Sequence, residues 1–202
     1  MEIIIANELL SIWAVFLLQE EPFNWASGIK SPIYCDNRLT LSAPEVRQKI
    51  EIGLATLVMK HYPECQMLMG TSTAGIAHAA ITASILGLPM GYVRGEAKDH
   101  GRGNRIEGKM DKGTKVVVIE DLISTGGSCI DVVEALREEG AEVLGIASIF
   151  TYGIKKGLMR IAGAGTVNYS LSNLDTLVEV AAEEGYIAPE WKNKIIEFRD
   201  SL

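Results

Sequence analysis

The segment Lys115–Ser128, which reads KVVVIEDLISTGGS, is the most informative part of this chain. It opens with consecutive β-branched apolar residues, a pattern typical of a strand buried on both faces of a parallel sheet. Two carboxylates, Glu120 and Asp121, come where this strand is expected to end. A helical pattern of apolar residues then runs from about Cys129 to Glu139. The sequence therefore predicts a strand, a short polar loop and a helix.

The loop of this unit has the composition of an anion-binding site. Free backbone N–H groups and the positive end of the helix dipole converge there. Glycines allow a close approach of the backbone, and the neighbouring hydroxyls add donors. The two carboxylates suit sugar hydroxyls or a bridging Mg²⁺. The candidate binding residues of this stretch are Glu120, Asp121, Leu122, Ile123, Ser124, Thr125, Gly126, Gly127 and Ser128.

The loop differs from other phosphate-binding motifs. It lacks the Gly-Lys-Ser/Thr ending of a Walker A loop and is not GxGxxG. A strand, two acidic residues and a Thr/Ser/Gly loop together resemble the phosphoribosyl pyrophosphate (PRPP) signature of type I phosphoribosyltransferases. An ordinary strand–turn–helix capped by a hydroxyl is the alternative interpretation. The resemblance implies an α/β fold with an open, mainly parallel sheet flanked by helices, and a small N-terminal hood.

A second segment has the same order of strand, polar loop and helix. A short apolar strand at 66–69 leads into Gly70–Gly75, GTSTAG, and a helix of small residues follows. Loops at the carboxyl ends of neighbouring parallel strands face one crevice. In the resembled family the corresponding loop contacts pyrophosphate, which makes Thr71, Ser72 and Thr73 candidate PRPP ligands. A simple turn remains the alternative.

The N-terminal part narrows the resemblance. Phe23–Arg38 indicates a turn followed by an extended segment, and within it Ser27–Tyr34 reads SGIKSPIY. This string is similar to the N-terminal segment of orotate phosphoribosyltransferases. The resemblance implies that residues 1–40 contribute to the hood over the active site. It also implies that the orotate ligands include Lys30, Tyr34 and Ser124.

Residues 95–108 are polar and glycine-rich. A segment of this length without apolar anchors is typical of a functional lid or a linker. The nearby cations Arg94, Lys98 and His100 suit a polyphosphate leaving group, so a lid is favoured. Lys98–Gly101 resembles the catalytic loop of the family, which reaches into the neighbouring subunit's site. The resemblance therefore implies a homodimer in which Arg94, Lys98 and His100 serve the partner's site.

The composition indicates a single domain over 1–202. The chain has 202 residues, 48% hydrophobic content and a net charge of −7, which argues against bulk attraction to nucleic acid or membrane. The apolar run Leu9–Leu18 is about half the ~20 residues that span a bilayer. Three cysteines without a CxxC motif fit a reducing interior, so we expect a cytoplasmic protein.

The remaining pattern predicts alternating strands and helices. Helices are expected at 3–20, 43–61, 76–86, 129–139, 154–162, 172–184 and 189–201. Strands are expected at 66–69, 89–94, 115–119, 142–150 and 166–169.

The resemblance also implies the chemistry. Phosphoribosyl transfer from magnesium PRPP to orotate would give orotidine 5′-monophosphate and pyrophosphate, a step of pyrimidine biosynthesis. The catalytic residues would be Lys98, His100 and Asp121, and Mg²⁺ would be held mainly by PRPP and water near the acid pair. No protein nucleophile is required, because orientation and stabilisation of the leaving group's charge carry the reaction.

Two positions depart from the family pattern. Many members have Lys where this chain has Gly95, and many have an Arg that contacts the base carboxylate where it has Thr151–Tyr152. These departures bear on base recognition more than on PRPP binding. A phosphoribosyltransferase for another base, such as a purine, and a non-catalytic PRPP-sensing regulator are the alternatives. The Lys30 segment argues against the first, and the cationic lid and net charge argue against the second.

Overall fold

A six-stranded sheet forms the centre of the computed structural model, which describes residues 1–17, 23–24, 28, 30–95 and 105–202. The sheet order is β10-β9-β8-β5-β6-β7, and only the β6–β7 pair is antiparallel. The strands are β5 (Met67–Thr71), β6 (Met90–Val93), β7 (Ile106–Glu107), β8 (Lys115–Ile123), β9 (Glu142–Thr151) and β10 (Asn168–Asn173). The expected α/β fold with an open, mainly parallel sheet is confirmed.

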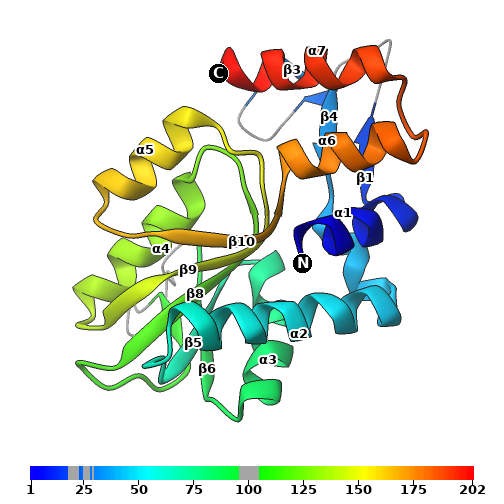
Figure 1. The fold of residues 1–202 in the computed structure, drawn as a ribbon. Helices are drawn as coiled ribbons and strands as arrows, with labels where there is room; N and C mark the ends of the chain where they lie inside the picture. The colour runs from blue at the N-terminus through cyan, green and yellow to red at the C-terminus, as the bar shows by residue number, and fades with distance from the viewer. Residues whose placement is uncertain (18–22, 25–27, 29, 96–104) are drawn as a thin grey trace.

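Helices cover both faces of this sheet (Figure 1). The buried side chains of β8 alternate: Val116 and Val118 belong to the core under α4, whereas Val117 and Ile119 belong to the larger core on the other face. The first face carries α4 (Gly127–Glu138) and α5 (Lys155–Gly163). The second carries α1 (Glu2–Ser11), α2 (Pro44–His61), α3 (Ala74–Leu86) and α6 (Leu174–Glu183), and α7 (Pro189–Asp200) packs on α6. Two-sided burial explains the uninterrupted apolar run of β8.

The N-terminal segment differs from the expected helix at 3–20. The helix α1 ends at Ser11, and Trp13 follows it with φ +57°. Trp13 N–H donates to Leu10 O at 3.0 Å and Ala14 N–H to Leu9 O at 3.0 Å, which is the Schellman pattern of a helix end. The helical prediction was wrong beyond Ser11 because the apolar residues that follow serve a strand.

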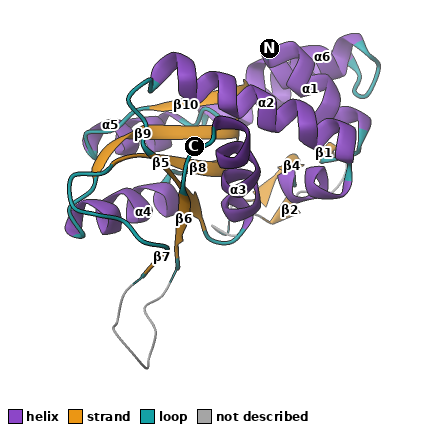
Figure 2. Ribbon diagram, turned by 90° about the horizontal axis from the view of Figure 1, so that it is seen from below, coloured by secondary structure: helices purple, strands orange, loops and turns teal. Residues whose placement is uncertain are grey.

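That strand opens the hood, by which we mean the described part of residues 15–42. β1 (Val15–Leu17) pairs antiparallel with β4 (Ile33–Cys35), and β2 (Phe23–Asn24) pairs with β3 (Lys30–Ser31). The hood ends with a 3₁₀ helix, η1 (Asn37–Ser42), which leads into α2. In Figure 2 the hood strands β1, β2 and β4 lie together at one side of the central sheet.

The strand β8 is longer than expected. It runs through Glu120 and Asp121 to Ile123, and its pairing with β9 continues to Ile123↔Thr151. Its pairing with β5 stops at Gly70↔Ile119. The carboxylates therefore lie inside the strand rather than after it, at a place where the pairing with β5 has stopped.

Most other boundaries agree with the sequence within a few residues. α3 and α4 begin earlier than expected, while β10 begins and ends later than the strand expected at 166–169. Within the described residues, no helix has both the length and the apolar content to cross a bilayer.

Candidate active site

Glu120 is the buried centre of the strand-end site. Only 4% of it is exposed, and both carboxylate oxygens accept hydrogen bonds. Thr71 Oγ1 donates to Oε1 at 2.6 Å, the Asp121 N–H donates to the same oxygen at 3.0 Å, and Ser128 Oγ donates to Oε2 at 3.0 Å. Burial first, and then the nearby charge of Asp121, raise the pKa of Glu120 to about 8. Glu120 thus ties the ends of β5, β8 and α4 together.

Asp121 is the more accessible carboxylate of the pair. It is half-buried and lines a cavity of about 440 Å³ at the carboxyl end of the sheet. The residues that line this cavity are Tyr34, Cys35, Asp36, Arg38, Ser72, Thr73, Ala74, Glu120, Asp121, Leu122 and Ser128. The structure thus brings together predicted site residues from the hood, the β5 loop and β8.

A second cavity of about 590 Å³ adjoins the first. Ser72 and Thr73 line both, and Tyr92, Arg94 and Glu107 are among the other lining residues of the second. Arg94 Nη1 lies 3.7 Å from Glu107 Oε1. Arg94 therefore adjoins the β5 loop of its own chain, and its service to a partner's site stays a prediction.

The loop at 124–128 is shaped by close packing against α5. Gly126 has φ +74° and precedes the first turn of α4. A Cβ at Gly157 of α5 would lie 2.5 Å from Ser124 O, so only glycine fits there. Arg160 Nη1 donates to Thr125 O at 3.1 Å. These contacts with α5 fix the main chain of the loop.

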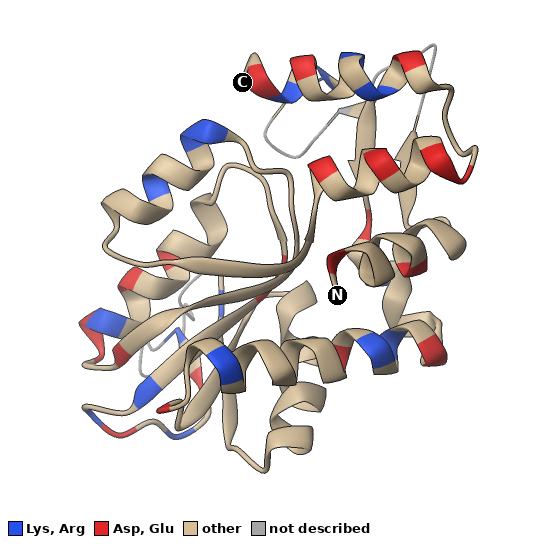
Figure 3. Ribbon diagram, in the orientation of Figure 1, with Lys and Arg blue, Asp and Glu red and all other residues tan. Residues whose placement is uncertain are grey.

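The loop also lies beside a basic helix face. Figure 3 shows the Lys and Arg positions of α5, and the sequence places Lys155, Lys156 and Arg160 there. Ser124, Thr125, Gly126 and Gly127 are not among the residues lining the 440 Å³ cavity. The Ile123 side chain points into the core under α4, and its carbonyl accepts the Tyr152 N–H at 3.0 Å. Ile123 thus supports the loop through its main chain.

Long-range polar contacts hold the hood over the cavity. Asn37 Nδ2 donates to Asp121 O at 2.6 Å, and the Cys35 N–H donates to the hydroxyl of Tyr152 at 2.9 Å. The Cys35 thiol donates to Asn37 Oδ1 at 3.2 Å, and burial raises the pKa of that thiol. Neither Asn37 nor the role of Tyr152 could be predicted from the sequence, because the hydrogen-bonding partners are 84 and 117 residues apart and no local pattern signals them.

An ion pair in the hood was also missed. Arg38 Nε donates to Asp36 Oδ1 at 2.6 Å and Arg38 Nη2 to Oδ2 at 2.8 Å. These hydrogen bonds lower the pKa of Asp36. Arg38 Nη2 also lies 3.4 Å from the hydroxyl of Tyr34, whose ring packs against Phe16 and Phe23. The signal that could have found this pair is the alternation of charged Asp and Arg directly after SPIYC.

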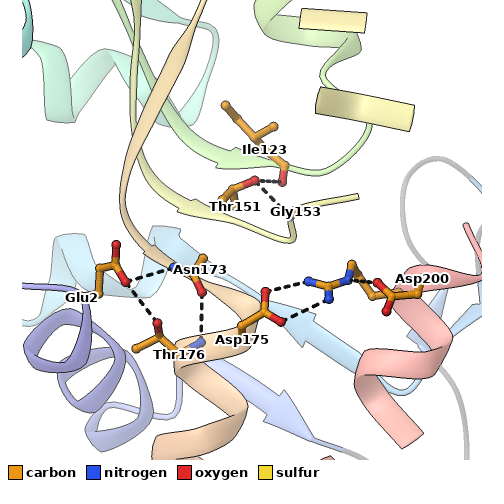
Figure 4. Close-up of polar contacts among 9 residues, drawn as sticks. Glu2, Ile123, Thr151, Gly153, Asn173, Asp175, Thr176 and Asp200 are labelled. Carbon is orange, nitrogen blue, oxygen red and sulfur yellow. Dashed lines mark hydrogen bonds and ion pairs between the residues drawn. The ribbon is translucent and has the colours of Figure 1, made fainter. Parts of the chain in front are cut away.

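Thr151 and Tyr152, one of the two departures from the family pattern, have structural roles at the end of β9. Thr151 Oγ1 donates to Ile123 O at 3.4 Å and accepts the Gly153 N–H at 3.1 Å (Figure 4). Tyr152 is buried, and burial raises the pKa of its hydroxyl. Neither residue lines the cavity. Gly95 lines the second cavity, next to Arg94.

Three predicted residues are not among those that line the cavities in the described part of the chain. Lys30 is exposed on β3 and is not among the residues lining either cavity. Lys98 and His100 lie outside the described residues, so their placement in the site stays a prediction.

Known proteins resemble this chain over almost its whole length. Residues 45–168 match the model of the phosphoribosyl transferase domain. The orotate phosphoribosyltransferase of Bacillus cereus (strain B4264) is 58% identical over 195 residues, which are 96% of this chain and 93% of that protein.

Solved structures of other proteins also resemble this chain. A crystal structure of orotate phosphoribosyltransferase from Aeropyrum pernix has a TM-score of 0.74 at 27% identity, over 90% of this chain and 99% of that one. Leishmania donovani UMP synthase has a TM-score of 0.86 at 26% identity, over 99% of this chain and 42% of that longer one.

Proposed function

This chain belongs to the orotate phosphoribosyltransferases, within the phosphoribosyl transferase domain family, and we propose how its strand-end site performs their reaction. The enzyme transfers the phosphoribosyl group of PRPP to orotate, giving orotidine 5′-monophosphate and pyrophosphate in pyrimidine biosynthesis. The observation that carries the mechanism is the half-buried Asp121 beside the buried, triply hydrogen-bonded Glu120, both in the lining of the 440 Å³ cavity.

PRPP lies across the carboxyl ends of β5 and β8. Its 5-phosphate occupies the 124–128 loop at the start of α4, where backbone N–H groups and the helix dipole favour an anion. Its ribose hydroxyls face Asp121, and its pyrophosphate extends along Thr71–Thr73 toward Arg94. The shared lining of the two cavities by Ser72 and Thr73 supports this path.

Catalysis comes from position and charge. The hood places orotate against C1 of the ribose, and pyrophosphate departs through an oxocarbenium-like state. Asp121 orients the ribose and stabilises positive charge at the reacting sugar. Lys98 and His100, on the lid, stabilise the leaving pyrophosphate, and His100 can donate a proton to it.

The donors around Glu120 indicate how Mg²⁺ fits. Both oxygens of Glu120 already accept hydrogen bonds from the protein, whereas Asp121 faces the cavity. No group of three or more His, Cys, Asp or Glu side chains among the described residues is placed to hold a metal. This arrangement fits a Mg²⁺ held mainly by PRPP and water, with Asp121 beside it. When bound, Mg²⁺ neutralises charge on the pyrophosphate.

The proposed assembly is a homodimer with a lid that crosses between subunits. The helix α3 carries no acidic, Lys or Arg side chain, and Ala80, Ser84 and Ile85 are exposed on it, Ile85 by 49%. An apolar helix face of this kind suits coverage by a second copy. Mixing Lys98→Ala and Asp121→Asn subunits tests the crossing, since hybrid dimers regain one intact site. No recovery of activity would contradict it.

The free thiols of the three cysteines support our proposal of a cytoplasmic location. Cys35, Cys65 and Cys129 are all free thiols, and burial raises the pKa of Cys129 to about 12. Unreactive, unpaired thiols suit a reducing compartment.

The activity is tested by following orotate absorbance after mixing with PRPP and Mg²⁺, beside reactions with adenine, hypoxanthine, xanthine and uracil. Turnover of orotate alone, lost in Lys98→Ala, is the expected result. Turnover of a purine would support the PRPP site but contradict the assignment of orotate as the base. PRPP binding with no turnover of any base would indicate a regulator.

A further inference from the structure

Orotate carries a carboxylate, and the cavity that would receive it is rich in acidic groups. Asp36, Glu120 and Asp121 all line it. An anionic base placed beside the charged carboxylates of Asp36 and Asp121 needs a cation, because like charges at short range repel. Among the described residues that line this cavity, Arg38 alone is Lys or Arg.

The geometry of Arg38 leaves one edge of its guanidinium for a ligand. Asp36 occupies the Nε/Nη2 edge through two hydrogen bonds of 2.6 and 2.8 Å. No described residue accepts a hydrogen bond from Nη1, and the Arg38 side chain is 62% exposed. A guanidinium can bind one carboxylate along each edge, since its donors form a fixed planar fork.

Asp36 also prepares Arg38 for this task. The hydrogen bonds that Arg38 donates to Asp36 raise the pKa of Arg38, which therefore stays charged. They also restrict the rotamers of a long side chain before the ligand arrives, which lowers the entropy cost of binding.

The neighbouring residues hold Arg38 in register with the reacting sugar. Asn37 donates to Asp121 O at 2.6 Å, so the residue next to Arg38 is fixed to the strand that carries the ribose ligand. Arg38 Nη2 also donates a long hydrogen bond, of 3.4 Å, to the hydroxyl of Tyr34. The aromatic ring of Tyr34 and the guanidinium thus lie on the same side of the cavity.

The other candidates for the base carboxylate are engaged elsewhere. Thr151 bonds to the main chain of Ile123 and Gly153, and Tyr152 bonds to the main chain of Cys35. Lys30 is exposed on β3 outside the cavity lining.

We propose that Arg38 binds the carboxylate of orotate through its Nη1/Nη2 edge and thereby selects orotate over bases that lack this group. This inference rests on the proposed phosphoribosyl transfer to orotate.

The test compares nucleotides that differ only in the carboxylate. With pyrophosphate, the reverse reaction consumes orotidine 5′-monophosphate or, as the matched probe, uridine 5′-monophosphate. In Arg38→Gln we expect kcat/KM for the first to fall about 100-fold, the usual scale for losing a bidentate charged pair. The KM for PRPP in the forward direction should change less than about threefold, and the preference for the carboxylated nucleotide should disappear.

Two further variants separate binding from structure. Arg38→Lys keeps the charge without the fork, so it should recover part of the preference. Arg199→Gln removes another Arg–Asp pair, with Asp175 at 2.7 and 3.1 Å, outside either cavity lining. This control should leave the preference at the wild-type value.

The outcomes distinguish the two claims. A wild type that fails to turn over orotate contradicts the proposed function itself. A wild type that is active, with an Arg38→Gln variant that keeps its preference or loses both nucleotides equally, overturns the role of Arg38 and leaves the function standing.

Discussion

The loop at 124–128 and the hood are built in different ways, although Ser128 and four hood residues line the same cavity. The loop at 124–128 lies between β8 and α4 and packs against α5, where Gly157 allows the two main chains to come into contact. The hood buries Val15, Ile33 and Cys35 in the larger core, and hydrogen bonds of Asn37 and Tyr152 join it to the end of the sheet. We expect PRPP binding to depend on the packing of the loop, and base binding to depend more on the long-range polar contacts of the hood. The two functions should therefore be separable by mutation.

Gly157→Ala should have the largest effect, confined to the loop. Its new Cβ would lie 2.5 Å from Ser124 O and 3.2 Å from Thr125 C, so the loop main chain must move. We expect the KM for PRPP to rise about 100-fold, since misplacement by about 1 Å costs that much. Steady-state kinetics at saturating orotate measures this.

Gly163→Ala is the matched control in the same helix. Nothing lies within 4 Å of a Cβ there. It should leave the KM for PRPP unchanged and stabilise the protein by up to about 1 kcal/mol, because alanine favours the helix. Equal effects of the two substitutions would contradict the packing account.

The contributions of Glu120 and Asp36 to stability should change with pH in opposite directions. Glu120 has a pKa raised from 4.5 to about 8, so the stability that its protonated form gives is complete below pH 4.5 and is lost as pH rises to 8. Asp36 has a pKa lowered from 3.8 by Arg38, so its contribution is present above pH 3.8 and is lost in more acidic solution.

Chemical denaturation across pH 3 to 9 measures both. Glu120→Gln should gain stability over the wild type progressively between pH 4.5 and 8, by a few kcal/mol at about 1.4 kcal/mol per pKa unit. Asp36→Asn should differ from the wild type by less, and least at the acidic end. A Glu120→Gln difference that stays flat across pH would contradict the raised pKa.

Asn37→Ala should affect the hood alone. Its loss removes the side-chain donor to the partly buried Asp121 carbonyl, at a cost of about 2 kcal/mol. We expect kcat/KM for orotate to fall about 30-fold, while the KM for PRPP changes little. Asn168→Ala, which removes hydrogen bonds to Ser148 and Ser170 away from the cavity, is the control. An equal loss of orotate affinity in both variants would argue against a positioning role.

Tyr152→Phe should have the smallest effect. Its hydroxyl accepts the Cys35 N–H, whereas the hydroxyl of Tyr62, also buried, donates to Ile146 O at 2.9 Å away from the site. Both Tyr→Phe variants should lose about 1 kcal/mol of stability. The KM for orotate should rise several-fold in Tyr152→Phe alone, and a similar rise in Tyr62→Phe would mean that general loosening is responsible.

The same contrast explains what the sequence could predict. The strand, loop and helix around Glu120 are neighbours in the chain, so periodicity and turn chemistry indicated them, and the sheet and most helices followed. The N-terminal helix was extended wrongly because apolar residues of β1 continue the apolar pattern of α1, and Trp13 breaks it in a left-handed conformation without glycine.

The hood contacts left no such signal. Asn37, Arg38 and Tyr152 look like surface or turn residues in the sequence, and their roles arise only when distant segments meet. The length of β8 was underestimated for a related reason: its carboxylates stay in the strand because pairing with β9 continues beside them after the pairing with β5 has stopped.

The most direct test of the account measures both KM values in Gly157→Ala and Asn37→Ala, each with the second substrate saturating. The account predicts a crossed result: Gly157→Ala raises the KM for PRPP and spares orotate, and Asn37→Ala does the reverse. If both variants raise both KM values alike, the sheet end and the hood do not divide the substrates between them, and the account is contradicted.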